Sequence, residues 1–277
     1  MHRCRETPRA NALGSQESDR WWARAQTISR EGVSYQVGGW RAYAERYQEF
    51  APELPFKLDP QRCALMIIDV QRKTCDPRAP RGMGKSLPER FPDLAGPYFE
   101  SLDQRVLPNL SSLLSFFRER SLRVLFTTVG PQLPSGDDLP YSFRVQYQSA
   151  LALGDGTGIY ADSPEYAIVE ELRPEPGELV VNKVSRSAFT ATGLENVLRN
   201  MGVEQLVIGG GATHACVEST GRSASDLGFQ VAVVDDACVS QFPLLHEATM
   251  INFHMSMGRV VATQEVLEEL EAAAAPR

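Results

Sequence analysis

A cysteine inside a glycine-rich segment is the side chain of this sequence best suited to do chemistry. The segment 205–229 reads QLVIGGGATHACVESTGRSASDLGF, which indicates a strand, a tight glycine turn and a helix. Cys216 falls at or just before the first turn of that helix, where unpaired N–H groups and the positive end of the helix dipole lie. Such a position can lower a thiol pKa from about 8.5 to roughly 3.5–7.5, and it offers donors for an oxyanion. The segment predicts a nucleophile; the alternative is a buried structural cysteine.

Two charged residues stand at comparable places in other apolar runs. The run ALMIID ends in Asp69, and the run ELVVNK ends in Lys183. Taken singly, an aspartate there is typical of a turn, and a lysine is typical of a solvated surface. In an open parallel sheet, however, the carboxyl ends of all strands share one edge, and the active crevice opens there. Because Asp69, Lys183 and Cys216 each follow a different strand, we expect one shared site.

Short apolar runs alternate with helical patterns along most of the chain, which predicts an α/β fold. Such alternation indicates βαβ units and a mainly parallel sheet covered on both faces, that is, a three-layer αβα architecture. In the strand order 3-2-1-4-5-6, the strands before Asp69 and Cys216 flank the topological switch point. The predicted strands are 64–70, 123–129, 179–181, 205–208, 230–234 and 259–262, and the predicted helices are 109–120, 193–201, 216–227, 244–257 and 264–272.

Domain organisation follows from where this periodic pattern begins. Residues 1–58 are polar at first and then carry scattered aromatics such as Trp21, Trp22 and Trp40, so we expect an extension that packs on the domain or on a neighbouring subunit. Residues 59–277 are then expected to form one α/β domain. The stretches 76–97 and 130–162 are rich in Pro, Gly and charge, and we expect two long loops there.

Composition argues against several partners. The net charge of −7 comes with no basic-aromatic stripe, which argues against nucleic acid. The apolar runs are too short to span a bilayer, and the first twenty residues lack the apolar core of a secretory signal, so we expect no membrane partner. The five cysteines include no CxxC pair. An odd number of unpaired thiols predicts a reducing compartment and a cytoplasmic location.

Three segments carry a family resemblance. IIDVQ, VNKVSRSAF and GGATHACVEST resemble the signature blocks of the isochorismatase-like cysteine hydrolases, with matching order and spacing over residues 61–272. The third block is most similar to ureidoacrylate-type amidohydrolases and to relatives that act on carbamoylated amines. The resemblance implies a six-stranded, Rossmann-like parallel sheet and an Asp69–Lys183–Cys216 triad. It also implies a cis peptide between Gly211 and Ala212, with the N–H groups of Ala212 and Cys216 as the oxyanion hole.

Two departures from related patterns refine the expected chemistry. Nicotinamidases of this superfamily carry a metal site with histidines, but no histidine lies between Arg3 and Thr213 here, so we expect no metal and no cofactor. Isochorismatases proper, which cleave a vinyl ether, typically lack the cysteine, so Cys216 favours C–N hydrolysis. His214 stands two residues before Cys216, and we expect it to line the pocket or to face solvent.

The combined prediction is a cysteine amidohydrolase that cleaves a small amide, ureide or carbamoyl compound through a thioester. Asp69 takes the thiol proton and later delivers it to the leaving amine, while Lys183 stabilises the thiolate and orients Asp69. The alternatives are an isochorismatase-type ether hydrolase and a non-catalytic thiol or redox-sensing protein of the same fold. Relatives imply a homodimer or a homotetramer.

Substrate contacts are expected near the triad residues. Gln71 follows Asp69 by two residues, and Arg186 and Phe189 follow Lys183 in the block VNKVSRSAF. By resemblance, Arg186 and Phe189 line the pocket, and an arginine fork matches a carboxylate in bidentate fashion. Arg144, in the predicted loop 130–162, is expected to help close over the substrate. The alternative for Arg186 is a solvated residue or one paired with an acidic neighbour.

Overall fold

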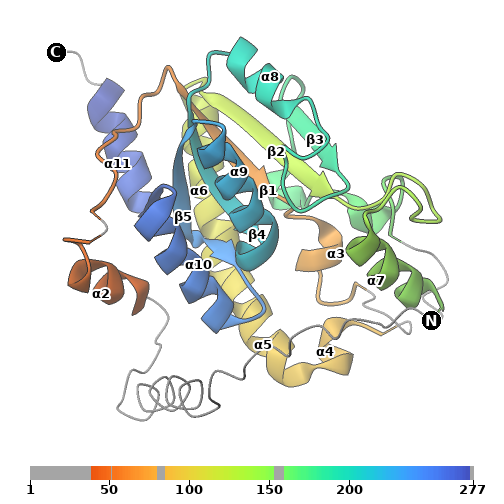
Figure 1. Ribbon diagram of the computed structural model, residues 1–277. Helices are drawn as coiled ribbons and strands as arrows, with labels where there is room; N and C mark the ends of the chain where they lie inside the picture. Colours follow the sequence, from red (N-terminus) through yellow and green to blue (C-terminus); the bar gives the residue numbers. More distant parts are fainter. Residues whose placement is uncertain (1–38, 51, 80–84, 153–158, 275–277) are drawn as a thin grey trace, which may run out of the picture. The chain divides into compact units, whose positions relative to one another are not determined.

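A six-stranded parallel sheet forms the centre of the protein (Figure 1). The computed structural model describes residues 39–50, 52–79, 85–152 and 159–274. The strand order is β3-β2-β1-β4-β5-β6, and all ladders are parallel, which confirms the predicted fold class. The strands are β1 (Cys63–Ile68), β2 (Arg123–Val129), β3 (Leu179–Lys183), β4 (Gln205–Gly211), β5 (Gln230–Val239) and β6 (Arg259–Val261).

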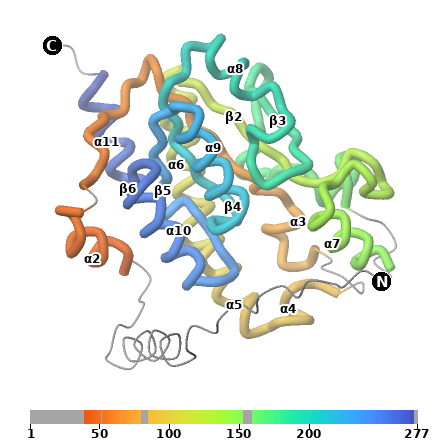
Figure 2. Tube along the Cα trace, in the orientation of Figure 1, coloured from red at the N-terminus to blue at the C-terminus, as the bar shows by residue number. Residues whose placement is uncertain are grey.

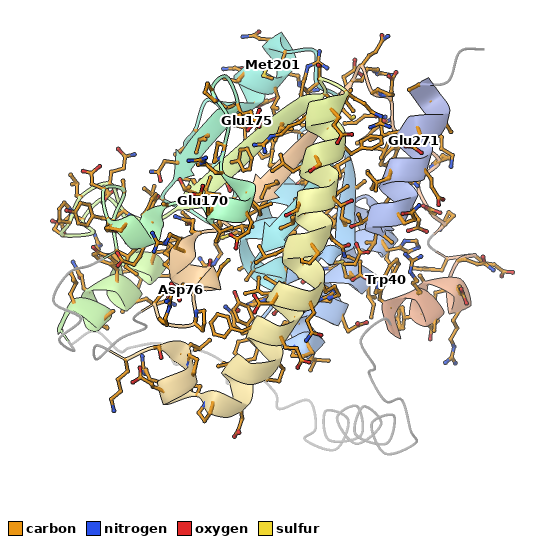
Figure 3. The ribbon with its side chains drawn as sticks, turned by 180° about the vertical axis from the view of Figure 1, so that it is seen from behind. Trp40, Asp76, Glu170, Glu175, Met201 and Glu271 are labelled. Atoms are coloured by element: carbon orange, nitrogen blue, oxygen red, sulfur yellow. The ribbon has the colours of Figure 1, made fainter. Side chains whose placement is uncertain are left out.

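One face of the sheet is covered by a long helical rod and by the last helix. Figure 3 shows the rod from behind, with α5 (Pro92–Ser101), the π-helical η1 (Leu102–Val106) and α6 (Leu107–Glu119) in succession. The apolar stripe of α6 and residues of α11 (Thr263–Ala274) pack with β1 and β2 in one hydrophobic cluster. Burial of this stripe is what fixes α6, because apolar residues recur at helical spacing on one side only.

The opposite face is covered by α8 (Leu194–Asn200), α9 (Glu218–Asp226) and α10 (Pro243–Ser256), as Figure 2 shows. Residues of these helices form a second hydrophobic cluster, which also contains Cys216. The two clusters together bury β1 and β4 on both sides, and every residue of β1 is buried. This explains why the central strands read as continuous apolar runs rather than as alternating ones.

The expectation of two long loops was partly wrong. The first stretch, which follows α3 (Arg72–Cys75), contains α4 (Leu87–Arg90) and the start of α5, and the second contains α7 (Tyr141–Ala152). Ser86 and Glu89 form a reciprocal capping box at α4, and proline occupies the first turn of both α4 and α5, where it costs no hydrogen bond. Two short 3₁₀ turns, η2 (Pro164–Tyr166) and η3 (Glu170–Leu172), lead into β3.

The helix α2 (Gly39–Arg46) belongs to the predicted extension and packs on α10. Trp40 is buried, and its main-chain N–H donates to Glu247 Oε2 at 2.8 Å, whereas Tyr43, Tyr47 and Phe50 are exposed. Residues 1–38, with Trp21 and Trp22, lie outside the described residues, so the boundary at 58 stays a prediction. None of the helices in the described ranges has both the length and the apolarity needed to cross a bilayer.

Candidate active site

The structure brings Asp69 and Lys183 together at the carboxyl edge of the sheet. Asp69 directly follows β1 with a φ of 52°, and Lys183 is the last residue of β3. The Lys183 Nζ donates to Asp69 Oδ2 at 2.7 Å, and the side chains of Lys183 and Asp69 are 0% and 3% exposed. A buried pair of this kind satisfies two charges that neither residue could leave unpaired in the interior.

A third residue, Thr127 on β2, completes the environment of Asp69. Its Oγ1 donates to Asp69 Oδ1 at 2.6 Å, so each carboxylate oxygen has its own donor. The Lys183 ammonium also donates to the carbonyl of Ser185 at 3.1 Å. Sequence reasoning missed Thr127. Its signal was a polar residue inside the buried run RVLFTTV, since buried polar side chains are almost always hydrogen-bonded.

Cys216 joins the same cluster from the turn after β4. This turn is π-helical over Thr213–Val217 (η4) and continues into α9. Burial raises the pKa of the Cys216 thiol to about 12; the charge of Asp69 adds to the rise, and the Lys183 ammonium opposes it. The predicted lowering of the thiol pKa by the helix end was therefore wrong, because Cys216 is only 7% exposed and desolvation dominates.

The glycine run explains how the Cys216 turn reaches Asp69. Gly210 has a φ of 123°, and a Cβ at this position would lie 2.2 Å from the Ile68 carbonyl oxygen. Only glycine therefore lets the ends of β4 and β1 approach so closely. The peptide bond between Gly211 and Ala212 is cis in the structure, at the position that the sequence resemblance named.

Gln71 is close to the site in sequence, but both polar atoms of its side chain form hydrogen bonds with the main chain. Its Nε2 donates to the Tyr166 carbonyl at 2.7 Å, and its Oε1 accepts from the Val129 N–H at 2.9 Å. The side chain is completely buried. It thus ties the end of β2 to the segment before β3, and a contact with substrate stays a prediction.

The two predicted arginines lie on adjoining elements. The Arg186 guanidinium stacks 4.5 Å from the Phe143 ring centroid, and its Nη1 donates to Ser142 Oγ at 3.3 Å, so it contacts α7. Arg144 is half-buried on the same helix. Within the part of the chain that the structure describes, neither guanidinium forms an ion pair with a carboxylate.

Phe189 and His214 contact residues outside the triad. The Phe189 ring packs on Phe229, with centroids 5.8 Å apart, as part of the hydrophobic packing, and its contact with substrate stays a prediction. His214 Nδ1 lies 2.8 Å from Ser240 Oγ, and burial lowers the pKa of the imidazole. Among the described residues, no group of three or more His, Cys, Asp and Glu side chains is placed to hold a metal ion.

Comparisons with known proteins show the family and the fold of this chain. Residues 63–265 match the model of the isochorismatase domain. A ureidoacrylate amidohydrolase, RutB, of Rhizobium rhizogenes is 27% identical over 251 residues, which cover 86% of this chain and 96% of the relative. A solved cysteine hydrolase from Pseudomonas syringae pv. phaseolicola has a TM-score of 0.65 at 20% identity, covering 80% of this chain and 98% of that one. The N-carbamoylsarcosine amidase of Thermoplasma acidophilum has a TM-score of 0.54 at 19% identity, covering 73% and 96%. These two structures share the fold.

Proposed function

The chain belongs to the isochorismatase family and is a hydrolase, and from this premise we propose that it is an amidohydrolase that cleaves a non-peptide C–N bond through Cys216. One observation supports this most: the Cys216 thiol lies close enough to a buried Asp69–Lys183 pair for both charges to act on its pKa. A nucleophile, a base and a group that orients the base are the parts that covalent acyl transfer requires. The curated relative from Rhizobium is named for an amide hydrolysis of this kind.

The proposed reaction starts from a protonated thiol. Asp69 accepts the Cys216 proton as Sγ attacks the carbonyl carbon, and the N–H groups of Ala212 and Cys216 stabilise the oxyanion. Collapse of the tetrahedral intermediate breaks the C–N bond, and Asp69 returns the proton to the leaving nitrogen. Water then attacks the thioester, with Asp69 as base, and frees Sγ as the second product leaves. Lys183 and Thr127 keep the carboxylate oriented through both halves of the reaction.

The substrate class follows from the charges around this cluster. Arg186 and the α7 helix that carries Arg144 are in contact, and neither arginine pairs with a carboxylate in the described residues. Two such cations on adjoining elements favour an anionic ligand. We therefore propose a small substrate with an amide or ureide at one end and a carboxylate at the other, such as the ureidoacrylate named for the relative.

Two measurements test these proposals separately. The first is ammonia release from a panel of small amides, ureides and carbamoyl compounds by the native chain and by Cys216→Ala. Turnover by the native chain and none by the variant is expected, whereas equal rates would overturn the role of Cys216. The second compares Arg186→Ala with the native chain on a matched acid and amide pair. Arg186 is exposed, so loss of its charge pair with a carboxylate should raise KM for the acid alone, by up to about 1 kcal/mol or about 5-fold. Equal losses on both substrates would refute the carboxylate anchor.

A further inference from the structure

A chain of buried polar side chains ends on the turn that carries Cys216. Thr213, the first residue of the turn, has its Oγ1 2.9 Å from His246 Nδ1, and His246 Nε2 lies 2.8 Å from Asp235 Oδ1. Thr213 is 0% exposed and His246 is 5% exposed. Three polar side chains in hydrophobic surroundings are costly unless each is paired, so their complete pairing calls for an explanation.

The charge of Asp235 fixes the direction of its hydrogen bond with His246. Burial acts to raise the pKa of Asp235, but the hydrogen bond from His246, the nearby Trp40 indole and the charge of Arg105 outweigh it and lower the pKa. Asp235 is thus a carboxylate, and His246 Nε2–H donates to it. In a neutral imidazole Nδ1 then accepts from the Thr213 hydroxyl, whereas in an imidazolium Nδ1–H donates to the Thr213 oxygen; either form ties Thr213 to His246.

The three residues come from three different elements around the turn. The β4–β5 register shifts between Ile208 and Gly210, and Asp235 lies in the shifted stretch of β5. His246 lies on α10, and Thr213 begins η4. The helix α2 holds the far end through Trp40, which Figure 3 labels, since its main-chain N–H binds Glu247 beside His246. Its indole Nε1 approaches Asp235 without a hydrogen bond of normal geometry in the described residues.

We propose that this Thr213–His246–Asp235 chain is a positioning network for the oxyanion donors. The inference rests on the proposed amidohydrolase function. Thr213 directly follows Ala212, and Cys216 comes three residues later in the same turn, so a fixed Thr213 side chain fixes the N–H groups on either side of it. A displacement of about 1 Å at such a position can cost about 100-fold in rate, which gives the network its catalytic value.

The test compares variants that keep or remove the Thr213 hydroxyl. Thr213→Val keeps the shape and loses the hydrogen bond, whereas Thr213→Ser keeps the hydroxyl. Thr249→Val is the matched control, because Thr249 is a buried threonine on α10 whose Oγ1 donates to Glu218 at 2.7 Å. We measure kcat and KM for ammonia release, the rate of Cys216 alkylation by iodoacetamide, and Tm. Alkylation forms no oxyanion, so its rate reports the reactivity of the Cys216 thiol and does not depend on the oxyanion donors.

The expected pattern is specific to a positioning role. Thr213→Val should lower kcat about 30–100-fold with KM and the alkylation rate within about 3-fold of the native values. Thr213→Ser should return kcat to within about 3-fold, and Thr249→Val should leave kcat within about 3-fold at a similar loss of Tm. His246→Leu combined with Thr213→Val should be no worse than either change alone, because the network acts as a unit.

Other outcomes refute the proposal in distinguishable ways. Unchanged kcat in Thr213→Val, in a chain whose native form hydrolyses amides, would overturn the network and leave the proposed function intact. Equal losses in kcat, alkylation and Tm would show a purely structural role for Thr213 and would also overturn it. If the native chain releases no ammonia from any amide while Cys216 is still alkylated, the proposed function fails, and the network falls with it.

Discussion

Lys183 should stabilise the fold as well as serve the reaction, and its removal gives the sharpest test of the site geometry. Lys183→Met keeps most of the apolar stem and deletes the ammonium that lies 2.7 Å from Asp69 Oδ2. The Asp69 carboxylate would stay 3% exposed, with the Thr127 hydroxyl as its remaining donor. Breaking one side of a buried ion pair costs about 3–5 kcal/mol, because the other charge is left uncompensated.

This loss is measurable by urea and thermal unfolding. For a chain of this size, about 3–5 kcal/mol corresponds to a drop in Tm of roughly 6–20 °C. The double variant Asp69→Asn, Lys183→Met removes both charges, and a buried pair replaced on both sides is often nearly neutral in stability. We therefore expect the double variant to recover most of the loss in stability and to remain inactive.

An exposed pair of nearly the same length serves as the control. Arg41 Nη2 lies 2.9 Å from Glu265 Oε2, but the two side chains are 44% and 47% exposed. Arg41→Met should cost at most about 1 kcal/mol, because solvent screens the pair. If Lys183→Met is no more destabilising than Arg41→Met, or if the double variant is as unstable as the sum of the single ones, the buried-pair reasoning is refuted.

Four other measurements probe the site. Because burial raises the pKa of Cys216 to about 12, its thiolate fraction and its alkylation rate should rise about tenfold per pH unit from pH 6 to pH 10; a plateau near pH 8.5 would contradict this. Gly210→Ala should prevent stable folding, since its Cβ would meet the Ile68 carbonyl at 2.2 Å, and native-like Tm would show that β4 shifts freely. Thr127→Val should lower kcat about tenfold with little change in KM, by loosening Asp69; an unchanged kcat would remove Thr127 from the site. Activity should survive EDTA, and its restoration by added zinc or iron after chelation would reveal a metal requirement.

The fold and the main site residues were predictable because both follow from apolar runs. Strands buried on both faces read as unbroken Val, Ile and Leu segments, and the predicted strand 123–129 coincides with β2. Parallel strands place their carboxyl ends on one edge, so the charged residues that terminate them had to meet there. This reasoning placed Asp69 and Lys183 correctly, although they come from strands that are not adjacent in the sheet.

The remaining features depend on contacts that no local pattern encodes. The helix α7 has no buried residue, so it lacks the apolar stripe by which a helix is predicted, and α5 contains an internal proline. The pairing of Thr213 with His246 and Asp235 joins residues up to 33 positions apart, and each alone reads as an ordinary polar residue. The sign of the Cys216 pKa shift was missed because a helix end lowers a thiol pKa only when burial does not outweigh it.

The burial of Cys216 bears on two hypotheses that the sequence left open, a catalytic cysteine and a redox-sensing one. A redox-sensing cysteine needs an accessible thiolate, since the thiolate is the species that oxidants attack. Cys216 is 7% exposed, and burial raises the pKa of its thiol, so the thiolate that oxidants attack is disfavoured. A protonated thiol suits an enzyme in which Asp69 removes the proton only as the C–S bond forms. In the proposed reaction a substrate carbonyl beside Sγ is what makes the thiol reactive, which is why we propose a catalytic cysteine rather than a sensor.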